Sequence, residues 1–292
     1  MHQYLKAIGF SNITTRRQER ELLEETEEDF SSHTLAELTK DCDFCEFVRE
    51  YGIGIGVKSC GEINGWDEFE REYYFPYFEG SGITSYADVV VEKKIDQEAY
   101  LGVCEDARVG VSIIFQLQNN VEYMKEYQLQ TLGTRSTSVT LAGLANRGKI
   151  LLPIVKNEAV QQAQQEEAHN RMMLLSAARQ GDSQALESLT LDDIDTYSKV
   201  SQRIGKEDVL SIVATYFMPY GLECTLYSIL GEILDMQMVV NDKTNETLYI
   251  LTLNVNDLHF DVCVPMAELS GEPEIGRRFK GEILLQGRIN FQ

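Results

Sequence analysis

Apolar residues near the start of the chain recur at steps of three and four, the spacing of one face of a helix. Residues 16–29 are mainly acidic, with Leu22 and Leu23 as apolar anchors, which predicts an exposed surface helix. A second helix is predicted after Thr34, because Glu37 three residues later completes a capping box. Its apolar stripe consists of Leu35, Leu38, Cys42, Cys45 and Val48. We therefore expect the first fifty residues to be helical.

From residue 51 the pattern changes to the two-residue period of a strand. Apolar residues at 51–57 alternate with Gly52, Gly54 and Gly56, which predicts one continuous strand. Glycine and asparagine, as at Asn119 and Asn120, separate the strand-like segments that follow. These segments are 86–91, 98–104, 109–117, 137–144 and 149–154.

Residues 157–180 form a polar, glutamine-rich helical pattern that ends at Gly181, a residue typical of helix C-termini. The last seventy residues return to strand patterns, broken by a turn at 241–245 and a short helical insert at 266–269. The predicted strands here are 226–240, 247–255, 258–264 and 279–290.

Together these elements predict an α+β protein with three parts. Residues 1–155 form an N-terminal helical and β-rich module, and residues 156–221 form a helical connector. Residues 222–292 form a C-terminal small β-barrel, similar to an OB fold or a split barrel.

Composition and charge restrict the function classes. The 43% hydrophobic content is typical of a globular protein, and the formal net charge of −21 disfavours binding to nucleic-acid phosphates. No apolar run approaches the roughly 20 residues that span a bilayer, so we expect no membrane contact. Because the first residues are not a signal peptide, we expect a cytoplasmic protein with reduced cysteines.

Cys42 and Cys45 have the spacing of a metal-binding or redox pair. A structural zinc site needs four ligands, and His33 and Cys60 are the nearby additions. Since both cysteines lie in the predicted apolar stripe, we favour core packing over a metal or redox site.

Other motifs are incomplete. The glycines at 52, 54 and 56 lack the spacing of a dinucleotide-binding loop and favour close backbone approach in a strand. Glu166 and His169 have no second copy, as a di-iron bundle would need. His259, Asp261 and Cys263 alternate along one strand, and successive members lie too far apart for a catalytic Cys-His arrangement. We therefore expect no cofactor and no assembled catalytic set.

A basic cluster near the C-terminus stands out in this acidic chain. Arg277, Arg278 and Lys280 lie between two glycines, and Arg288 follows nearby. Arginine binds carboxylate or phosphate with two parallel hydrogen bonds, so the cluster is a candidate site for a small anion or a protein partner. The alternative is that these residues pair with the chain's own carboxylates.

These observations favour a non-catalytic binding or regulatory protein, and two alternatives stay open. An enzyme with an unfamiliar site is the first, in the region 73–104, where Glu79, Asp88 or Glu105 would lie in a cleft beside aromatic residues 73–78. Single-stranded nucleic-acid binding by the C-terminal barrel is the second, and it needs exposed aromatics beside arginines.

Several segments carry a resemblance to a known family. They are residues 2–11, 100–104 with 110–115, and 271–273 leading into the basic cluster. On these segments the chain resembles a family of cytoplasmic proteins from clostridia and related Gram-positive anaerobes, defined as a domain of unknown function. The resemblance extends over nearly the whole chain. It implies a bacterial, intracellular protein and brings no mechanism with it.

Overall fold

The computed structural model describes residues 2–39, 42–93, 100–130, 137–153 and 213–291, together with the isolated positions 173, 174, 177, 182, 184 and 188. The helix predicted at 157–180, with Glu166 and His169, lies almost entirely outside the described residues. What is described consists mainly of strands with a few short helices, so the expected α+β class is confirmed as a β-rich one. No described helix is long and apolar enough to cross a membrane.

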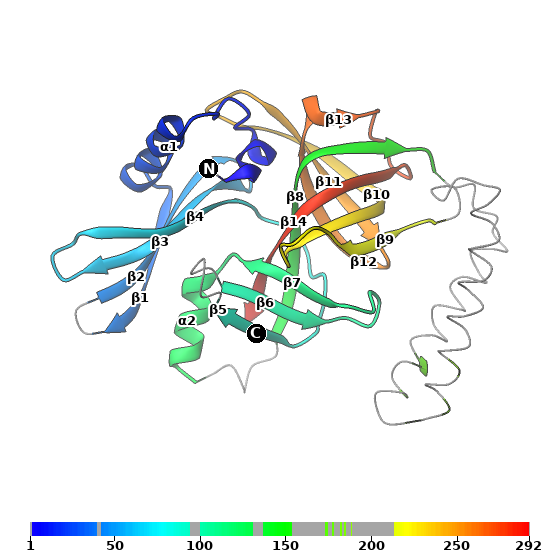
Figure 1. Cartoon of the computed structure of the whole chain (residues 1–292), viewed down its shortest axis with the longest axis horizontal. Coiled ribbons are helices and arrows are strands. Elements are labelled where there is room, and N and C mark those ends of the chain that lie inside the picture. Colours follow the sequence, from blue (N-terminus) through cyan, green and yellow to red (C-terminus); the bar gives the residue numbers. More distant parts are fainter. Residues whose placement is uncertain are drawn as a thin grey trace.

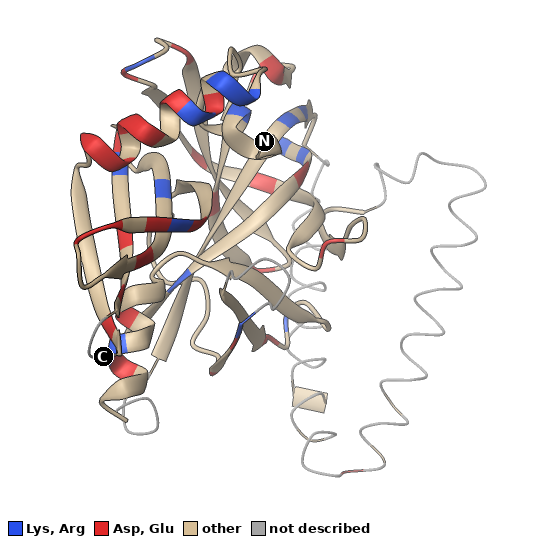
Figure 2. Ribbon diagram, turned by 60° about the vertical axis from the view of Figure 1, so that its left-hand side comes forward, with Lys and Arg blue, Asp and Glu red and all other residues tan. Residues whose placement is uncertain are grey.

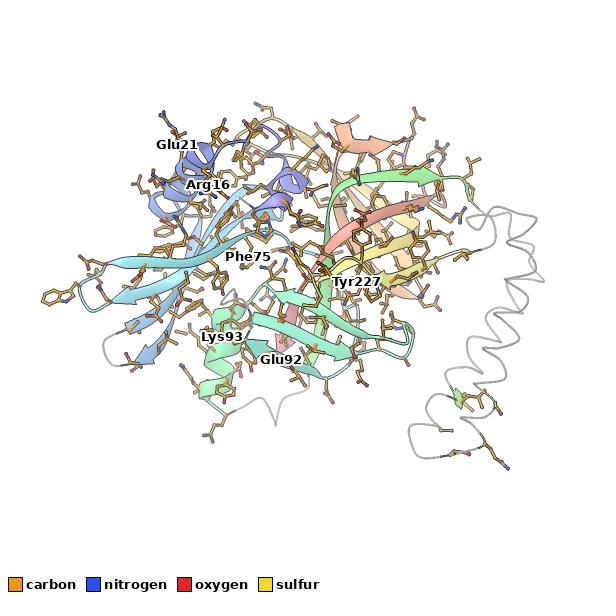
Figure 3. The ribbon with its side chains drawn as sticks, viewed as in Figure 1. Arg16, Glu21, Phe75, Glu92, Lys93 and Tyr227 are labelled. Carbon is orange, nitrogen blue, oxygen red and sulfur yellow. The ribbon has the colours of Figure 1, made fainter. Side chains whose placement is uncertain are left out.

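A four-stranded antiparallel sheet carries the N-terminal part of the fold, with its strands in chain order (Figure 1). These strands are β1 (Ser32–Thr39), β2 (Cys42–Gly52), β3 (Ile55–Asn64) and β4 (Phe69–Phe78). One face packs against η1 (Gln3–Ile8) and α1 (Arg16–Glu28). The opposite face packs against α2 (Asn120–Gln128), where Phe75 on β4 joins the buried cluster (Figure 3). The sheet is therefore covered on both faces.

The first long helix, α1, forms where the acidic pattern predicts it. Thr15 caps the helix by accepting a hydrogen bond from the backbone N–H of Gln18, and the Gln18 Oε1 accepts one from the backbone N–H of Thr15. Its two leucines are buried, while acidic residues recur along the ribbon in red in Figure 2. Glu27 instead contacts the sheet, with its carboxylate 2.6 Å from a nitrogen of Arg71. The predicted surface helix at 16–29 is confirmed.

A ten-stranded sheet makes up the rest of the described fold. Its core strands are β8 (Thr137–Leu151), β10 (Leu226–Val240), β11 (Thr247–Val255), β12 (Leu258–Pro265) and β14 (Arg278–Phe291). The pairing runs from β8 through β12, β11 and β10 to β14, and β14 pairs again with β8. The order of pairings thus returns to the strand where it began.

Further strands extend this sheet at its edges. On β14 it continues through β7 (Ser112–Leu117), β6 (Tyr100–Glu105) and β5 (Val89–Lys93). The short strands β9 (Tyr216–Pro219) and β13 (Leu269–Ser270) pair with β10 and β8, and η2 (Met266–Glu268) precedes β13. Tyr227 on β10, labelled in Figure 3, ties the extension to the core. Its hydroxyl accepts from the Ile114 N–H at 2.8 Å.

One of the hydrophobic clusters joins the two sheets. Residues of η1 and β3 pack in a single buried cluster with residues of β8, β11 and β12. Gln286 on β14 reinforces the junction, because its Nε2 donates to the Pro76 carbonyl of β4 at 2.8 Å. Moreover β8, from the predicted N-terminal module, pairs with β12 and β14 of the predicted C-terminal module. The domain boundaries themselves stay a prediction.

Turn chemistry explains why the C-terminal strands were predicted with nearly correct ends. Asn241 begins the β10–β11 turn, where its Oδ1 accepts from the N–H groups of Lys243 and Thr244 at 3.0 Å each. The β11–β12 turn is formed by Asn256 and Asp257, both with positive φ, as a tight two-residue hairpin turn requires. The predicted strands and the short insert at 266–269 are confirmed here.

The prediction of a helix after Thr34 is wrong, because residues 32–39 form β1 and residues 42–52 form β2. A sheet covered on both faces buries neighbouring residues on opposite sides, which blurs the alternation of a half-exposed strand. Phe44, Cys45 and Glu46 are all buried for this reason. The apolar residues at three- and four-residue steps do not form one buried stripe, since Leu35 and Leu38 on β1 are exposed and Cys45 on β2 is buried.

Two further predictions need correction. Residues 51–57 are not one strand, since β2 ends at Gly52 and β3 begins at Ile55. Gly54 lies in the turn between them with φ of 71°, a conformation that favours glycine. Residues 137–144 and 149–151 of the two predicted segments belong to the single strand β8, and the helix α2 begins at Asn120, where only a strand break was predicted.

Candidate functional site

A cavity of ≈ 330 Å³ opens on the face of the four-stranded sheet that packs against α2. Strands β1 to β4 form one wall, and the segment from Gln118 to Glu122 forms another. Arg288 of β14 completes the lining. The cavity thus lies where the two sheets and α2 meet, and it is lined by residues far apart in the sequence.

Strand register brings the sheet side chains together. Thr34 on β1 lies opposite Glu46 on β2, and Val48 on β2 lies opposite Lys58 on β3. Residues directly opposite in an antiparallel pair point to the same face, and alternate residues along a strand do so too. Tyr77 on β4 joins the same face through its partner Gly56. The cavity wall is therefore fixed by the pairing of the sheet.

A buried ion pair forms the floor of the cavity. Lys58 Nζ lies 2.6 Å from Glu46 Oε1, and their side chains are 10% and 4% exposed. Lys58 Nζ also donates to the Gln118 carbonyl at 2.9 Å and lies 5.2 Å from the centroid of the Tyr77 ring. Since an ammonium has three N–H donors, two of them are already engaged and the aromatic face offers a further favourable contact.

The Glu46 carboxylate has fewer of its hydrogen-bonding positions filled than the Lys58 ammonium. Its second carboxylate oxygen, Oε2, is buried and has no hydrogen-bond donor among the described residues. An unpaired buried acceptor costs about 1–3 kcal/mol, and more when it is charged. Glu46 also lines the cavity, so a carboxylate with one unsatisfied oxygen lies in the cavity wall.

Tyr77 forms a neutral aromatic wall. Burial, followed by the nearby carboxylates of Glu50, Glu79 and Glu46, raises the pKa of the Tyr77 hydroxyl far above its usual range. The phenol therefore stays protonated at any physiological pH. Gly56 leaves room for this ring, because a Cβ there would approach the Tyr77 hydroxyl oxygen to 2.8 Å. A Cβ at Gly56 would also clash with the backbone carbonyl of Arg49 on the paired strand, so this third glycine of the motif permits the close backbone approach that the sequence predicts.

The outer part of the cavity is lined by a looser ion pair. Arg288 Nη2 lies 3.4 Å from Glu122 Oε2, and their side chains are 53% and 44% exposed. Glu122 is also held by Asn119, whose Nδ2 donates to it at 2.8 Å. An exposed pair at this distance contributes at most about 1 kcal/mol. Arg288 can therefore exchange its partner at little cost.

The predicted basic cluster is divided in the structure. Arg278 lies opposite Leu151 of β8, whereas Arg288 lies opposite Thr140, near the other end of that strand. At about 3.3 Å per residue, the ten intervening steps separate Arg278 from Arg288 by about 30 Å. Arg288 reaches the cavity, and Arg277, Arg278 and Lys280 lie elsewhere.

The three remaining basic residues differ in burial. Arg278 is 7% exposed, and it donates from Nε and Nη1 to the carbonyls of Leu152 and Val213 at 3.1 and 3.0 Å. Arg277 forms an ion pair with Glu274 at 2.9 Å. Lys280 is half-buried on β14. Two of the three thus engage the protein's own backbone or carboxylates.

Cys42 and Cys45 lie on β2 three residues apart, so they point to opposite faces of the sheet and do not share a ligand position. Cys42 Sγ donates to Glu62 at 3.1 Å, and this bond, with burial, raises the Cys42 pKa to about 11. Burial raises the Cys45 pKa to about 12. Among the described residues, no group of three or more potential metal ligands gathers anywhere.

The acidic candidates of the region 73–104 separate in a similar way. Glu79 lines the cavity beside Tyr77, whereas Asp88 and Glu105 are exposed. Asp261, from the predicted set of His259, Asp261 and Cys263 on β12, accepts hydrogen bonds from the backbone N–H and the hydroxyl of Ser81 and so takes part in the packing between the sheets. A cleft that holds Glu79 beside an aromatic residue is thus present.

The central residues of the cavity, Lys58 and Glu46, were not identified from the sequence. The available signal was a charged residue inside an apolar strand pattern, at Phe44–Val48 and at Val57–Ser59. Long charged residues are rarely buried unless paired, so two of them on strands expected to be adjacent would have indicated an ion pair. The mistaken helix after Thr34 concealed that adjacency.

The chain matches a protein family over residues 5–287, described as a domain of unknown function named for an E. rectale gene (DUF3881). Because the match covers nearly the whole chain, the protein belongs to this family, as the resemblance implied. No curated protein and no solved structure matches the chain.

Proposed function

We propose that the protein binds a small polar molecule in the cavity between the four-stranded sheet and α2. Glu46 carries the proposal, because this residue lines that cavity and its buried Oε2 has no donor within the part of the chain that the structure describes. A volume of ≈ 330 Å³ lies within the range of small-molecule sites, which is about 300–1,000 Å³. Binding rather than catalysis remains the favoured role, as the sequence indicated.

The energetic character of the floor supports a binding site over plain core packing. Replacing a buried ion pair by well-packed apolar residues is often neutral or stabilising. The pair of Lys58 and Glu46 therefore gives the fold little that apolar residues would not supply. A preorganised set of charged groups facing a cavity is what recognition of a polar ligand requires.

The test is a screen of small polar compounds by ligand-observed NMR, with a variant that fills the cavity. Thr34→Trp places an indole on the cavity side of β1, and His33→Trp places one on the opposite face as a control. We expect bound compounds to be lost in Thr34→Trp and retained in His33→Trp. The proposal fails if no compound binds, or if both variants bind equally well.

An enzyme at the same cavity is the second candidate. It is favoured by Glu79, which lies beside Tyr77 as that hypothesis required. Incubation of a bound compound with the protein, followed by mass spectrometry, separates the two candidates. Recovery of unchanged compound supports binding alone, and a product that is lost in Thr34→Trp supports catalysis.

The original anion or protein-partner site at Arg277 and Arg278 stays a separate hypothesis. Alanine at both positions tests it, and unchanged binding of every detected anion or partner would contradict it.

For the fold, we infer that the pairing ring of β8, β12, β11, β10 and β14 is the expected small barrel. The pairing of β8 with both β12 and β14 supports this, with β8 added to the C-terminal strands.

A further inference from the structure

We infer that the cavity selects a ligand carrying a protonated amine. This inference rests on the proposed function and adds the chemical class of the ligand. It begins from the charge of the lining, where the described residues supply four carboxylates, Glu46, Glu50, Glu79 and Glu122. The cations are two, Lys58 and Arg288. The lining therefore has an excess of two negative charges.

The cations are already matched by two of the carboxylates. Lys58 pairs with Glu46 at 2.6 Å, and Arg288 pairs with Glu122 at 3.4 Å. Among the described residues, Glu50 and Glu79 form no ion pair with a cation. These two carboxylates thus set the field that an entering molecule meets, and that field attracts a cation.

Glu46 provides the specific acceptor within that field. Its Oε1 is used by Lys58, so Oε2 remains for a donor from the ligand. An ammonium adds the attraction between opposite charges to its hydrogen bond with the carboxylate, whereas a hydroxyl offers the hydrogen bond alone, and this difference favours an amine over a hydroxyl. The low exposure of this oxygen strengthens the preference, since a poorly solvated charge gains more from a charged partner.

An anionic ligand is disfavoured by the same contacts. Lys58 donates hydrogen bonds to Glu46 and to the Gln118 carbonyl, and it would have to break a buried contact in order to bind an anion. Arg288 is more accessible, but an anion held there would still meet the uncompensated charges of Glu50 and Glu79. The acidic lining therefore acts against carboxylates and phosphates as well as for amines.

Three matched four-carbon alcohols test the inference: aminobutanol, butanediol and hydroxybutanoate. They differ in a single end group, which is an ammonium, a hydroxyl or a carboxylate. We expect calorimetry or NMR titration to give aminobutanol a Kd roughly tenfold below that of butanediol, with hydroxybutanoate weaker still. Raising the salt concentration should weaken the binding of aminobutanol and leave the binding of butanediol unchanged.

Two variants locate the preference without disturbing the buried pair. Glu79→Gln and Glu50→Gln each remove one unpaired lining charge, and each should weaken aminobutanol roughly threefold while leaving butanediol unchanged. Glu105→Gln, on an exposed residue outside the cavity, is the control. Butanediol or hydroxybutanoate binding as tightly as aminobutanol would overturn the inference.

The screen separates this inference from the proposed function. If none of the three alcohols binds but other compounds bind and are lost in Thr34→Trp, the amine inference is wrong and the cavity remains a binding site. If the screen also finds no bound compound, the proposed function fails as well.

Discussion

Lys58 on β3 and Glu46 on β2 form an ion pair of 2.6 Å on a face of the sheet that is otherwise largely apolar. The pair is closed in by the Tyr77 ring and by the Gln118 carbonyl at the end of β7. It thereby links the four-stranded sheet to the segment that leads into α2. The same contact also forms the floor of the candidate site, so stability and recognition depend on the same two side chains.

We expect the two halves of this pair to be strongly coupled. Lys58→Met leaves the Glu46 carboxylate buried without its cation, and should lower the free energy of unfolding by about 3–5 kcal/mol. Glu46→Leu should cost a similar amount, because the lysine is then the unpaired charge. Urea denaturation followed by circular dichroism measures both values.

The double variant Lys58→Met/Glu46→Leu is the decisive control. Removing both charges restores an apolar face, so its loss should be clearly smaller than the sum of the two single losses. Additive losses would mean that the pair is solvated in solution and is not the buried contact described above.

Much of the C-terminal half could be predicted from the sequence because its signals are local. The turn at Asn241 and the positive-φ residues Asn256 and Asp257 fix hairpins whose strands alternate clearly. The failure at 32–52 has the opposite cause. In β2, burial on both faces removes the alternation, and the partners that create that burial lie outside the segment, whereas β1 is exposed at every residue except Ala36 and has no buried face to alternate.

The candidate site was foreseen in part, through Arg288 and Glu79. Neither residue indicated the other, because Arg288 reaches the cavity from β14 and Glu79 follows β4. Their proximity depends on how the two sheets and α2 pack, and no local pattern encodes that packing. The sequence grouped Arg288 with Arg278 because they are close along the chain. On an extended strand, however, each residue adds about 3.3 Å, so ten residues place the two side chains far apart in space.

Acid stability should depend on Asp106. Burial raises the pKa of this carboxyl, but hydrogen bonds from Arg108 and Ser85 outweigh it and lower the pKa to about 2. A depressed folded-state pKa stabilises the fold above the unfolded value of 3.8, and that contribution is lost as the pH falls toward 2. We expect Asp106→Asn to cost about 2 kcal/mol at pH 7 and to flatten the pH dependence of stability between about pH 5 and pH 2.

Asp88→Asn is the matched control, because Asp88 is exposed. Denaturation at a series of pH values should give it the same acid profile as the unchanged protein. If Asp106→Asn retained the full slope, the Arg108 contact would not be formed in solution.

Thiol reactivity should distinguish one cysteine from the other five. Burial or a bond to a carboxylate raises the pKa of Cys42, Cys45, Cys60, Cys104 and Cys263. The thiolate is the reactive form, so these five should react slowly in the folded protein. Cys224 is exposed, and we expect a single fast phase with a disulfide reagent that Cys224→Ser removes. Fast reaction of Cys42 and Cys45 together would instead indicate a redox or metal-binding pair.

Arg277 and Arg278 should differ sharply although they are adjacent. Arg278 is buried and donates to the Leu152 and Val213 carbonyls, which lie on either side of the long segment between β8 and β9. Arg278→Ala removes the donors of both carbonyls, and should lower the free energy of unfolding by about 2 kcal/mol or more. Arg277→Ala removes a partly exposed ion pair with Glu274, so its cost should stay below about 1 kcal/mol.

Arg278→Lys adds a charge-conserving variant to this comparison. A lysine cannot reproduce the two directed hydrogen bonds of the guanidinium group. The decrease in the free energy of unfolding of Arg278→Lys should therefore be closer to that of Arg278→Ala than to zero. Denaturation midpoints at equal protein concentration give the ranking. Equal losses for Arg277→Ala and Arg278→Ala would contradict a structural role for Arg278. A loss confined to anion or partner binding would return both residues to the recognition site first expected from the sequence.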